Sequence, residues 1–279
     1  MFHWSDIPKY INPTLFSIGP IEIRWYGLMY IVAFLTVYTL ALYRIKTEKL
    51  EYAKQTIIDF IFWAIWGVLI GGRLGYVLFY NFRYFVSNPL TIISPFDVSN
   101  GFHYTGISGM SYHGGMIGLF LVLILFCRKN KMDVLPFADL FIPSIPIGYT
   151  FGRLGNFVNG ELYGRVTTVP WGMYFPLDAT HQLRHPSQLY EAFSEGILLF
   201  IILWSLRKTK FFDGFLLSLY LISYGLVRIP IEFVREPDSQ LGFILGPFTM
   251  GQILCVAMIL GGTLIMMYRG SGRRQHITK

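Results

Sequence analysis

The sequence predicts an all-α polytopic membrane protein of about seven transmembrane helices, with the N-terminus outside and the C-terminus cytoplasmic. Its 279 residues are 53% hydrophobic and only 14% charged, whereas a soluble domain carries about 25% charged residues. Seven apolar runs approach or reach the length of about 20 residues that a bilayer span requires. Basic residues gather after alternate runs. These observations favour one integral-membrane domain covering residues 1–279.

The predicted spans are defined by continuous apolar stretches between polar segments. They cover approximately residues 23–43, 56–80, 108–127, 136–151, 190–206, 213–232 and 247–268. The fourth run is the shortest and contains Pro136, Pro143 and Pro146. Because an internal proline removes a helix hydrogen bond and clashes with the preceding turn, we expect this span to be kinked.

The orientation follows from the loops. Four basic clusters follow the first, third, fifth and seventh runs: Arg44, Lys46, Lys49, Lys54; Arg128, Lys129, Lys131; Arg207, Lys208, Lys210; and Arg269, Arg273, Arg274, Lys279. Cytoplasmic loops are enriched in lysine and arginine, so these loops are predicted to be cytoplasmic. The clusters hold 14 of the 23 basic residues. We interpret them as a topology signal only, which explains the net charge of +7 without a nucleic-acid partner.

Arginine dominates the other basic positions. These are Lys9, Arg24, Arg73, Arg83, Arg153, Arg165, Arg184, Arg228 and Arg235. The planar guanidinium group can bind two phosphate oxygens at once, which favours an anionic ligand. Arg73 and Arg228 fall inside apolar runs, where a charged side chain usually faces a polar cavity. Structural ion pairs or snorkelling side chains are the alternative.

The segment 152–165, GRLGNFVNGELYGR, is unusually polar for this chain. Arg153 and Asn156 are three residues apart and would share a face of a helix. Glu161 could pair with an arginine or accept a proton. The glycines would let the backbone turn tightly beside a ligand. The pattern indicates anion binding, although a helix end followed by an ordinary loop is the simpler alternative.

Two histidines stand beside predicted helix starts. His113 opens the third run in GMSYHGGMIG, where it could transfer a proton near neutral pH or serve a structural role. His185 precedes Pro186 in RHPSQLYE, and proline suits the first turn of a helix. We therefore interpret His185, Ser187 and Gln188 mainly as a helix start.

The sixth run ends with a stripe of polar side chains. Tyr224, Arg228 and Glu232 are spaced four residues apart, and Arg235 follows on roughly the same face. An Arg228–Glu232 ion pair is the structural interpretation, whereas a membrane-embedded charged stripe also suits a wet cavity. Together with the earlier segments, the sequence predicts a cradle for an anionic headgroup. Its members are His113, Arg153, Asn156, Glu161, Arg228 and Glu232.

At these residues the chain resembles the bacterial prolipoprotein diacylglyceryl transferase family. The likeness covers nearly the whole sequence, and its motifs occur in the family's order. They are IRWYGLMY, GGRLGY, MSYHGG, GRLGNFVNGELYGR, HPSQLYE, YGLVRIPIEFVREPD and MGQIL. The resemblance implies a seven-span enzyme of the bacterial inner membrane, with its active site toward the outer face.

The resemblance also implies the reaction. Diacylglycerol would pass from phosphatidylglycerol to the lipobox cysteine of a prolipoprotein, which gives a thioether and glycerol 1-phosphate and is the first step of lipoprotein maturation. The family's essential histidine falls on His113 and its lipid-binding arginines on Arg153 and Arg228. The other residues carried over are Asn156, Glu161, Gly164, Tyr26, Tyr224 and Glu232.

The residues themselves leave the proton acceptor open. A thiol must lose its proton to become a good nucleophile, and His113, Glu161 and Glu232 are the candidates. The expected partners are phosphatidylglycerol, a lipobox segment and the lipid bilayer, with no metal and no organic cofactor. A transporter or lipid flippase is the main alternative, although we find no internal repeat of the kind typical of transporters. A seven-span receptor is the other.

Overall fold

The computed structural model describes residues 3–19, 21–79, 82–92, 96–97, 103–104, 109–236, 243–245 and 248–277. Helices dominate, and the strands form short antiparallel pairs, β1 with β2, β3 with β4 and β5 with β6. In chain order the elements are η1 (Trp4–Asp6), α1 (Ile7–Tyr10), β1 (Thr14–Ile18), β2 (Ile21–Arg24), α2 (Trp25–Glu48), α3 (Lys54–Phe79), α4 (Phe82–Ser87), η2 (Pro89–Ile92), β3 (Phe96–Asp97), β4 (His103–Tyr104), α5 (Tyr112–Lys129), α6 (Val134–Phe141), η3 (Ile142–Ser144), α7 (Ile145–Asn159), α8 (Ser187–Glu191), the π-helix η4 (Ala192–Leu198), α9 (Leu199–Leu206), α10 (Phe215–Glu232), β5 (Phe243–Leu245), β6 (Phe248–Thr249) and α11 (Met250–Ile277).

Six helical segments of the described chain are long and apolar enough to cross a membrane. They are Trp25–Glu48, Lys54–Leu78, Val134–Asn159, Ser187–Leu206, Phe215–Glu232 and Met250–Ser271. These segments match the first, second and fourth to seventh predicted spans. The third predicted span matches α5, which has 18 residues and is not among the six. The chain is therefore an all-α polytopic membrane protein, while the seventh span and the orientation stay predictions.

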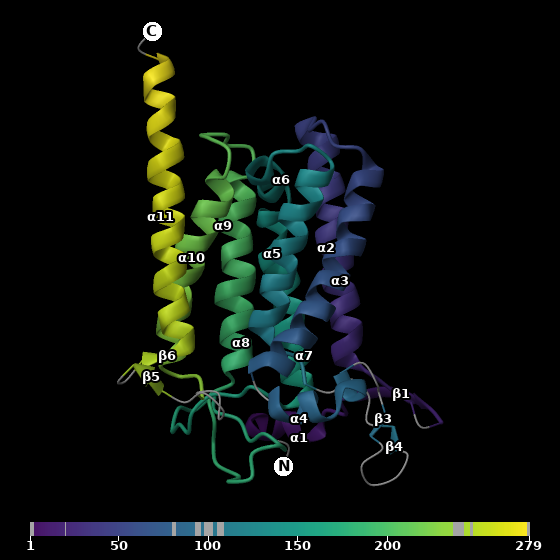
Figure 1. Cartoon of the computed structure of the whole chain (residues 1–279). Coiled ribbons are helices and arrows are strands. Elements are labelled where there is room, and N and C mark those ends of the chain that lie inside the picture. The colour runs from purple at the N-terminus through teal and green to yellow at the C-terminus, as the bar shows by residue number, and fades with distance from the viewer. Residues whose placement is uncertain are drawn as a thin grey trace. The chain divides into compact units, whose positions relative to one another are not determined.

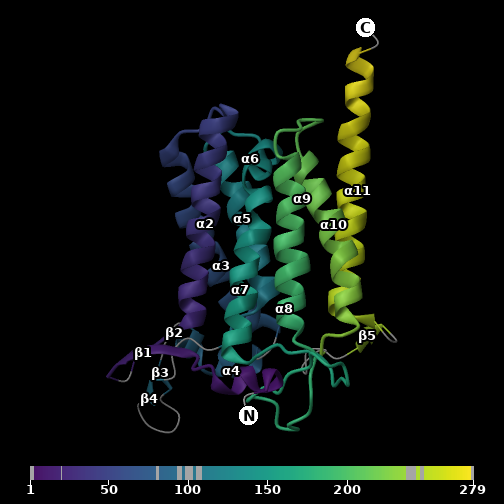
Figure 2. The same cartoon turned by 180° about the vertical axis from the view of Figure 1, so that it is seen from behind.

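The chain divides into two compact units, which we describe separately. The first comprises Met1–Leu50 and Ala138–Lys279, and the second comprises Glu51–Phe137. In the first unit α2 packs along α7, and α10 packs along α11 (Figures 1 and 2). Buried Ile142, Leu203 and Leu216 form an apolar core there. The prediction of one domain over residues 1–279 stays a prediction.

The fourth span is interrupted where its prolines lie. The α-helix α6 gives way to the 3₁₀ turn η3, which contains Pro143, and α7 then starts with Pro146 in its first turn. Proline is tolerated there because the first helical N–H groups have no intrahelical partner. The α-helix is thus interrupted at its prolines, while the predicted kink stays a prediction.

A buried arginine joins several helices at the C-terminal end of α2. Arg44 is only 3% exposed. Its Nη1 donates to the backbone oxygens of Asp139 and Leu140, at 2.5 and 2.8 Å, and its Nη2 donates to the backbone oxygen of Arg207 at 3.1 Å. Its Nη2 also lies 2.7 Å from the carboxylate of Glu48. The interpretation of all four basic clusters as topology signals alone is therefore wrong for Arg44, which ties helix ends together.

In the second unit, glycines bring α3 and α5 into close contact. Gly67, Gly71 and Gly75 on α3 face Gly114 and Gly118 on α5. A Cβ atom at Gly118 would lie 2.0 Å from the Gly67 carbonyl oxygen, so no larger side chain fits without separating the helices. Small residues serve this purpose in membrane helices. Gly71 and Gly75 belong to the GGRLGY segment, whose small residues thus allow the two helices to approach closely.

Arg73, also in the second unit, binds a polypeptide segment that follows α3. Its guanidinium group donates to the backbone oxygens of Thr91, Ile92 and Gly109, at 2.7, 2.8 and 3.2 Å. It also lies over the ring of Phe85, 5.0 Å from the ring centroid. These contacts agree with the structural alternative for this arginine.

Candidate active site

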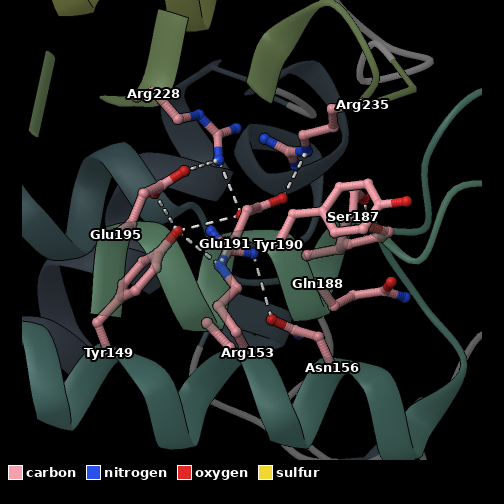
Figure 3. Close-up of polar contacts among 12 residues, drawn as sticks. Tyr149, Arg153, Asn156, Ser187, Gln188, Tyr190, Glu191, Glu195, Arg228 and Arg235 are labelled. Carbon is pink, nitrogen blue, oxygen red and sulfur yellow. Dashed lines mark hydrogen bonds and ion pairs between the residues drawn. The ribbon is translucent and has the colours of Figure 1, made fainter. Parts of the chain in front are cut away.

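The polar signature begins on α7 in the first unit. Arg153 and Asn156 share a face of this helix, as their spacing predicts, and Arg153 Nη1 donates to Asn156 Oδ1 at 3.3 Å (Figure 3). The helix ends at Gly160, whose positive φ of 67° suits glycine. The chain then turns so that Glu161 Oε1 accepts hydrogen bonds from the amides of Asn156 and Asn159, at 2.9 and 3.3 Å.

Glu191 lies at the centre of the arginine cluster. Its carboxylate is 0% exposed, and its Oε2 is 2.8 Å from both Arg153 Nε and Arg228 Nη1. Its Oε1 lies 3.9 Å from Arg235 Nε (Figure 3). Sequence reasoning assigned no role to this residue, although it closes the HPSQLYE motif. A glutamate at the start of an apolar span was the signal that could have identified it.

Glu195 and Tyr149 bridge the two central arginines. Glu195 Oε1 accepts from Arg228 Nη1 at 3.0 Å, and its Oε2 accepts from the Tyr149 hydroxyl at 2.7 Å. The same hydroxyl oxygen accepts from Arg153 Nε at 2.7 Å. A chain of hydrogen bonds thus runs from Arg153 through Tyr149 and Glu195 to Arg228 (Figure 3). Neither bridging residue was among the predicted site residues.

The predicted polar stripe on α10 completes the cluster. Arg228 Nη2 donates to Glu232 Oε1, and Glu232 Oε2 accepts from the Thr249 hydroxyl at 3.0 Å. Arg235 Nη1 lies 3.6 Å from the same carboxylate. The structural ion pair between Arg228 and Glu232 is therefore present.

Charge is balanced within this buried cluster. Three arginines (Arg153, Arg228, Arg235) face three glutamates (Glu191, Glu195, Glu232). Charged side chains are stable away from water only when they are paired and hydrogen-bonded. The arrangement supplies guanidinium groups for an anion, and each is oriented by carboxylates.

The helix that carries the two central glutamates is anchored to the signature turn. The side chains of Ser187 and Gln188, at the start of α8, donate to the backbone oxygens of Leu162 and Glu161, at 3.1 and 2.7 Å. After Glu191 the helix continues as the π-helix η4. Such segments are rare and often occur at functional sites. Ser187 and Gln188 therefore start a helix, as predicted, and also position Glu161.

The remaining predicted residues of the first unit lie around this cluster. A Cβ atom at Gly164 would lie 2.4 Å from the Val234 backbone oxygen, so only glycine allows this approach of two chain segments. The ring of Tyr26 borders Gly155, because a Cβ atom there would lie 2.9 Å from Tyr26 Cδ2. The ring of Tyr224 stands edge-on to Tyr149, 6.3 Å between centroids.

The side chain of His113 lies outside the described residues. Its backbone belongs to α5 in the second unit, two residues after Ser111, whose hydroxyl caps that helix by accepting from the Gly114 amide at 3.2 Å. The predicted convergence of Arg153, Asn156, Glu161, Arg228 and Glu232 is present, whereas the position of His113 relative to them stays a prediction.

A loop after the signature is held by a buried ion pair. The guanidinium group of Arg184 donates to both carboxylate oxygens of Asp178, at 2.8 and 3.0 Å. These bonds hold the pKa of Asp178 far below its usual value and raise the pKa of Arg184. Burial lowers the pKa of the neighbouring His185, which contacts the Tyr190 hydroxyl through Nδ1 at 3.2 Å.

Within the described chain, no group of three or more His, Cys, Asp or Glu side chains could hold a metal ion. The chemistry available from these residues is anion binding by guanidinium groups and proton acceptance by carboxylates.

Comparisons with known proteins identify the family of the chain. Residues 13–268 match the model of a family described as prolipoprotein diacylglyceryl transferase. The chain is 57% identical over 266 residues to the phosphatidylglycerol–prolipoprotein diacylglyceryl transferase of Chlorobaculum tepidum, covering 95% of this chain and 92% of the relative. It is 47% identical over 255 residues to that of Coxiella burnetii, covering 91% and 93%. For Campylobacter hominis the identity is 43% over 264 residues, covering 94% and 92%. The chain therefore belongs to the prolipoprotein diacylglyceryl transferase family.

Proposed function

We propose that this chain transfers the diacylglyceryl group of phosphatidylglycerol to the lipobox cysteine of a prolipoprotein. The thiolate sulfur attacks the carbon of the diacylglyceryl group that is bonded to the phosphate oxygen. A carbon–sulfur bond forms, the carbon–oxygen bond to the phosphate breaks, and the electron pair stays on the phosphate oxygen. The products are a thioether-linked diacylglycerol and glycerol 1-phosphate. Family membership and the buried arginine cluster support this assignment.

In this proposal Arg153 and Arg228 bind the phosphate. Negative charge builds on that group as the carbon–oxygen bond breaks, and oriented cations stabilise such charge most strongly where water is excluded. Glu191 and Glu195 contact these two guanidinium groups and orient them. The surroundings of the lipid headgroup in this proposal are formed by Asn156, Gly164, Tyr26 and Tyr224.

The proton of the thiol goes to His113 or Glu161. The third candidate, Glu232, is less suited, because one oxygen is bound by Arg228 and the other by Thr249. Glu161 Oε1 accepts hydrogen bonds from two neutral amides, those of Asn156 and Asn159. Among the described residues, none donates a hydrogen bond to its other carboxylate oxygen, Oε2. We propose His113 as the base, with Glu161 as the second candidate.

We further propose seven spans in the bacterial inner membrane, with the N-terminus and the active site on the outer face of the bilayer. In the first unit Arg44 and Arg207, from the basic clusters after spans one and five, meet at one end. The signature turn and Arg235 meet at the opposite ends of their helices, through the pair Gly164–Arg235. Single cysteines at Lys129 and Lys208 should react with an impermeant thiol reagent only after the cytoplasmic side is opened. Labelling from outside in intact cells would exclude this topology.

The activity is tested with purified protein, phosphatidylglycerol and a lipobox peptide. We expect the peptide to gain the mass of one diacylglyceryl group while an equal amount of glycerol 1-phosphate is released. A peptide whose cysteine is replaced by serine is the matched control. Lipid binding without either product would favour a transporter or receptor instead.

A further inference from the structure

Two buried amide oxygens beside Glu161 have no hydrogen-bond donor among the described residues. They belong to Asn159 and Gln188, and Gln188 is 0% exposed. The amide nitrogen of Asn159 donates to the Glu161 carboxylate, and that of Gln188 donates to the Glu161 backbone oxygen. Both Glu161 atoms can only accept, so the nitrogens must face them and the amide oxygens must point elsewhere.

A buried acceptor without a donor costs free energy, and each such group in a native structure needs an explanation. The ligand that would satisfy both oxygens must bring hydrogen-bond donors. It must also lie next to the arginine cluster, because Asn156 connects Glu161 to Arg153. An anionic phosphodiester whose headgroup carries hydroxyl groups meets both requirements.

We infer that the side-chain oxygens of Asn159 and Gln188 accept hydrogen bonds from the two hydroxyls of the glycerol headgroup and so select phosphatidylglycerol among anionic lipids. The inference rests on the proposed function. The phosphate lies on the guanidinium side of Asn156, and the headgroup glycerol extends toward Glu161. The two donors of the headgroup match the two acceptors in number.

The test compares phosphatidylglycerol with phosphatidylpropanol of the same acyl chains. Both lipids carry the same charge, but the propyl headgroup has no hydroxyl. Either lipid gives the same thioether-linked peptide, so one mass measurement reports both reactions. We expect kcat/KM of the unaltered protein to favour phosphatidylglycerol at least about tenfold, since a site built for hydroxyls discriminates strongly against their absence. Equal use of the two lipids would overturn the inference.

Gln188→Met and Asn159→Leu remove an acceptor at nearly constant volume. Both variants also lose the amide N–H group that donates to Glu161, which lowers the rate with either lipid by a shared factor. The rate with phosphatidylglycerol should fall further, so that the preference for this lipid drops at least about tenfold, because only phosphatidylglycerol loses a headgroup hydrogen bond. If the residues only hold Glu161, both rates should fall by the same factor, and an unchanged ratio would refute the headgroup contact. Gln55→Met, on α3 of the second unit, is the matched control, and its ratio should equal that of the unaltered protein.

Binding separates this inference from the reaction. If the unaltered protein lipidates no peptide, the proposed function fails. The relative affinities of the two lipids, measured by competition in nanodiscs, then still test the headgroup contact. Preference for phosphatidylglycerol that is lost in Gln188→Met would support it, and equal affinities would refute it.

Discussion

Arg44 donates to the backbone oxygen of Asp139, while the carboxylate of Asp139 accepts from the backbone amides of Gly214 and Leu217, both at 2.8 Å. Asp139 thus accepts a hydrogen bond from α2 through its backbone oxygen, and its carboxylate caps the start of α10. Asp139→Ala should therefore lower the free energy of unfolding by about 1–2 kcal/mol, as loss of a helix cap typically does. Thermal unfolding in detergent measures this. The exposed neighbour Asp213→Ala should change the Tm little, and an equal loss in both variants would contradict the capping role.

The guanidinium forks of Arg153 and Arg228 are expected to be essential for turnover. Lysine keeps the charge but cannot bind two groups at fixed geometry. Arg153→Lys and Arg228→Lys should each reduce kcat by about 10²–10³-fold, the usual effect of removing one group that stabilises transition-state charge. Lys208→Ala should remain near the unaltered rate. Full turnover of both lysine variants, in folded and inserted protein, would refute the phosphate-binding role.

The proton acceptor is tested with His113→Gln. If His113 is the base, the variant should still bind phosphatidylglycerol but lose about 10²–10⁴-fold of the rate. Raising the pH should then restore part of the rate, because solution supplies the thiolate. Lipid affinity and the pH–rate profile of this variant are the measurements. Weak lipid binding with no alkaline recovery would transfer the base role to Glu161.

Contact between α3 and α5 depends on glycine. Gly118→Ala would place a Cβ atom 2.0 Å from the Gly67 carbonyl oxygen, so we expect a loss of about 1–3 kcal/mol from overpacking. Gly261→Ala on α11 is the control, because a Cβ atom there meets nothing within 4 Å. It should leave stability unchanged or slightly raised. Similar melting temperatures for the two variants would show that the helices separate at little cost.

The loop after the signature should loosen in acid. The folded pKa of Asp178 is depressed, so its contribution to stability is complete above its ordinary pKa of about 3.9. The contribution is lost as the pH falls from there through the folded value. The Met173 and Arg184 amides bond to each other's carbonyl oxygens, and their protection factors against hydrogen exchange should fall below about pH 4. Asp178→Asn should remove this pH dependence, whereas Asp6→Asn, in an exposed pair, should not.

Local spacing predicted the contacts made within one helix. The Arg153–Asn156 and Arg228–Glu232 contacts join residues three and four apart, and the 3₁₀ turn of the fourth span lies at one of its prolines. Six of the apolar runs match the six helical segments of the described chain that are long and apolar enough to span a membrane. Composition and periodicity suffice for such features because they depend on neighbours in the chain.

Contacts between distant segments could not be predicted in this way. Tyr149 and Glu195 meet across 46 positions of sequence, and Arg44 reaches the Arg207 carbonyl across 163. An arginine that follows an apolar run, such as Arg44, is interpreted from sequence as a topology signal. Its burial could not be predicted, because it depends on which helix ends pack around it. The same argument explains why Glu191 was overlooked, since its significance lies in three arginines from two other segments.

The balanced charges around Glu191 change what lipid binding would mean. Internal carboxylates offset the cost of removing three arginines from water, so the cluster is balanced in charge by its own side chains. A phosphate that binds these guanidinium groups, as we propose, would do so by exchange with a resident anion. Affinity would then reflect the difference between two anions, one of them tethered to the chain. Return of the Glu191 carboxylate to its arginines would compete with the released glycerol phosphate and hasten its departure.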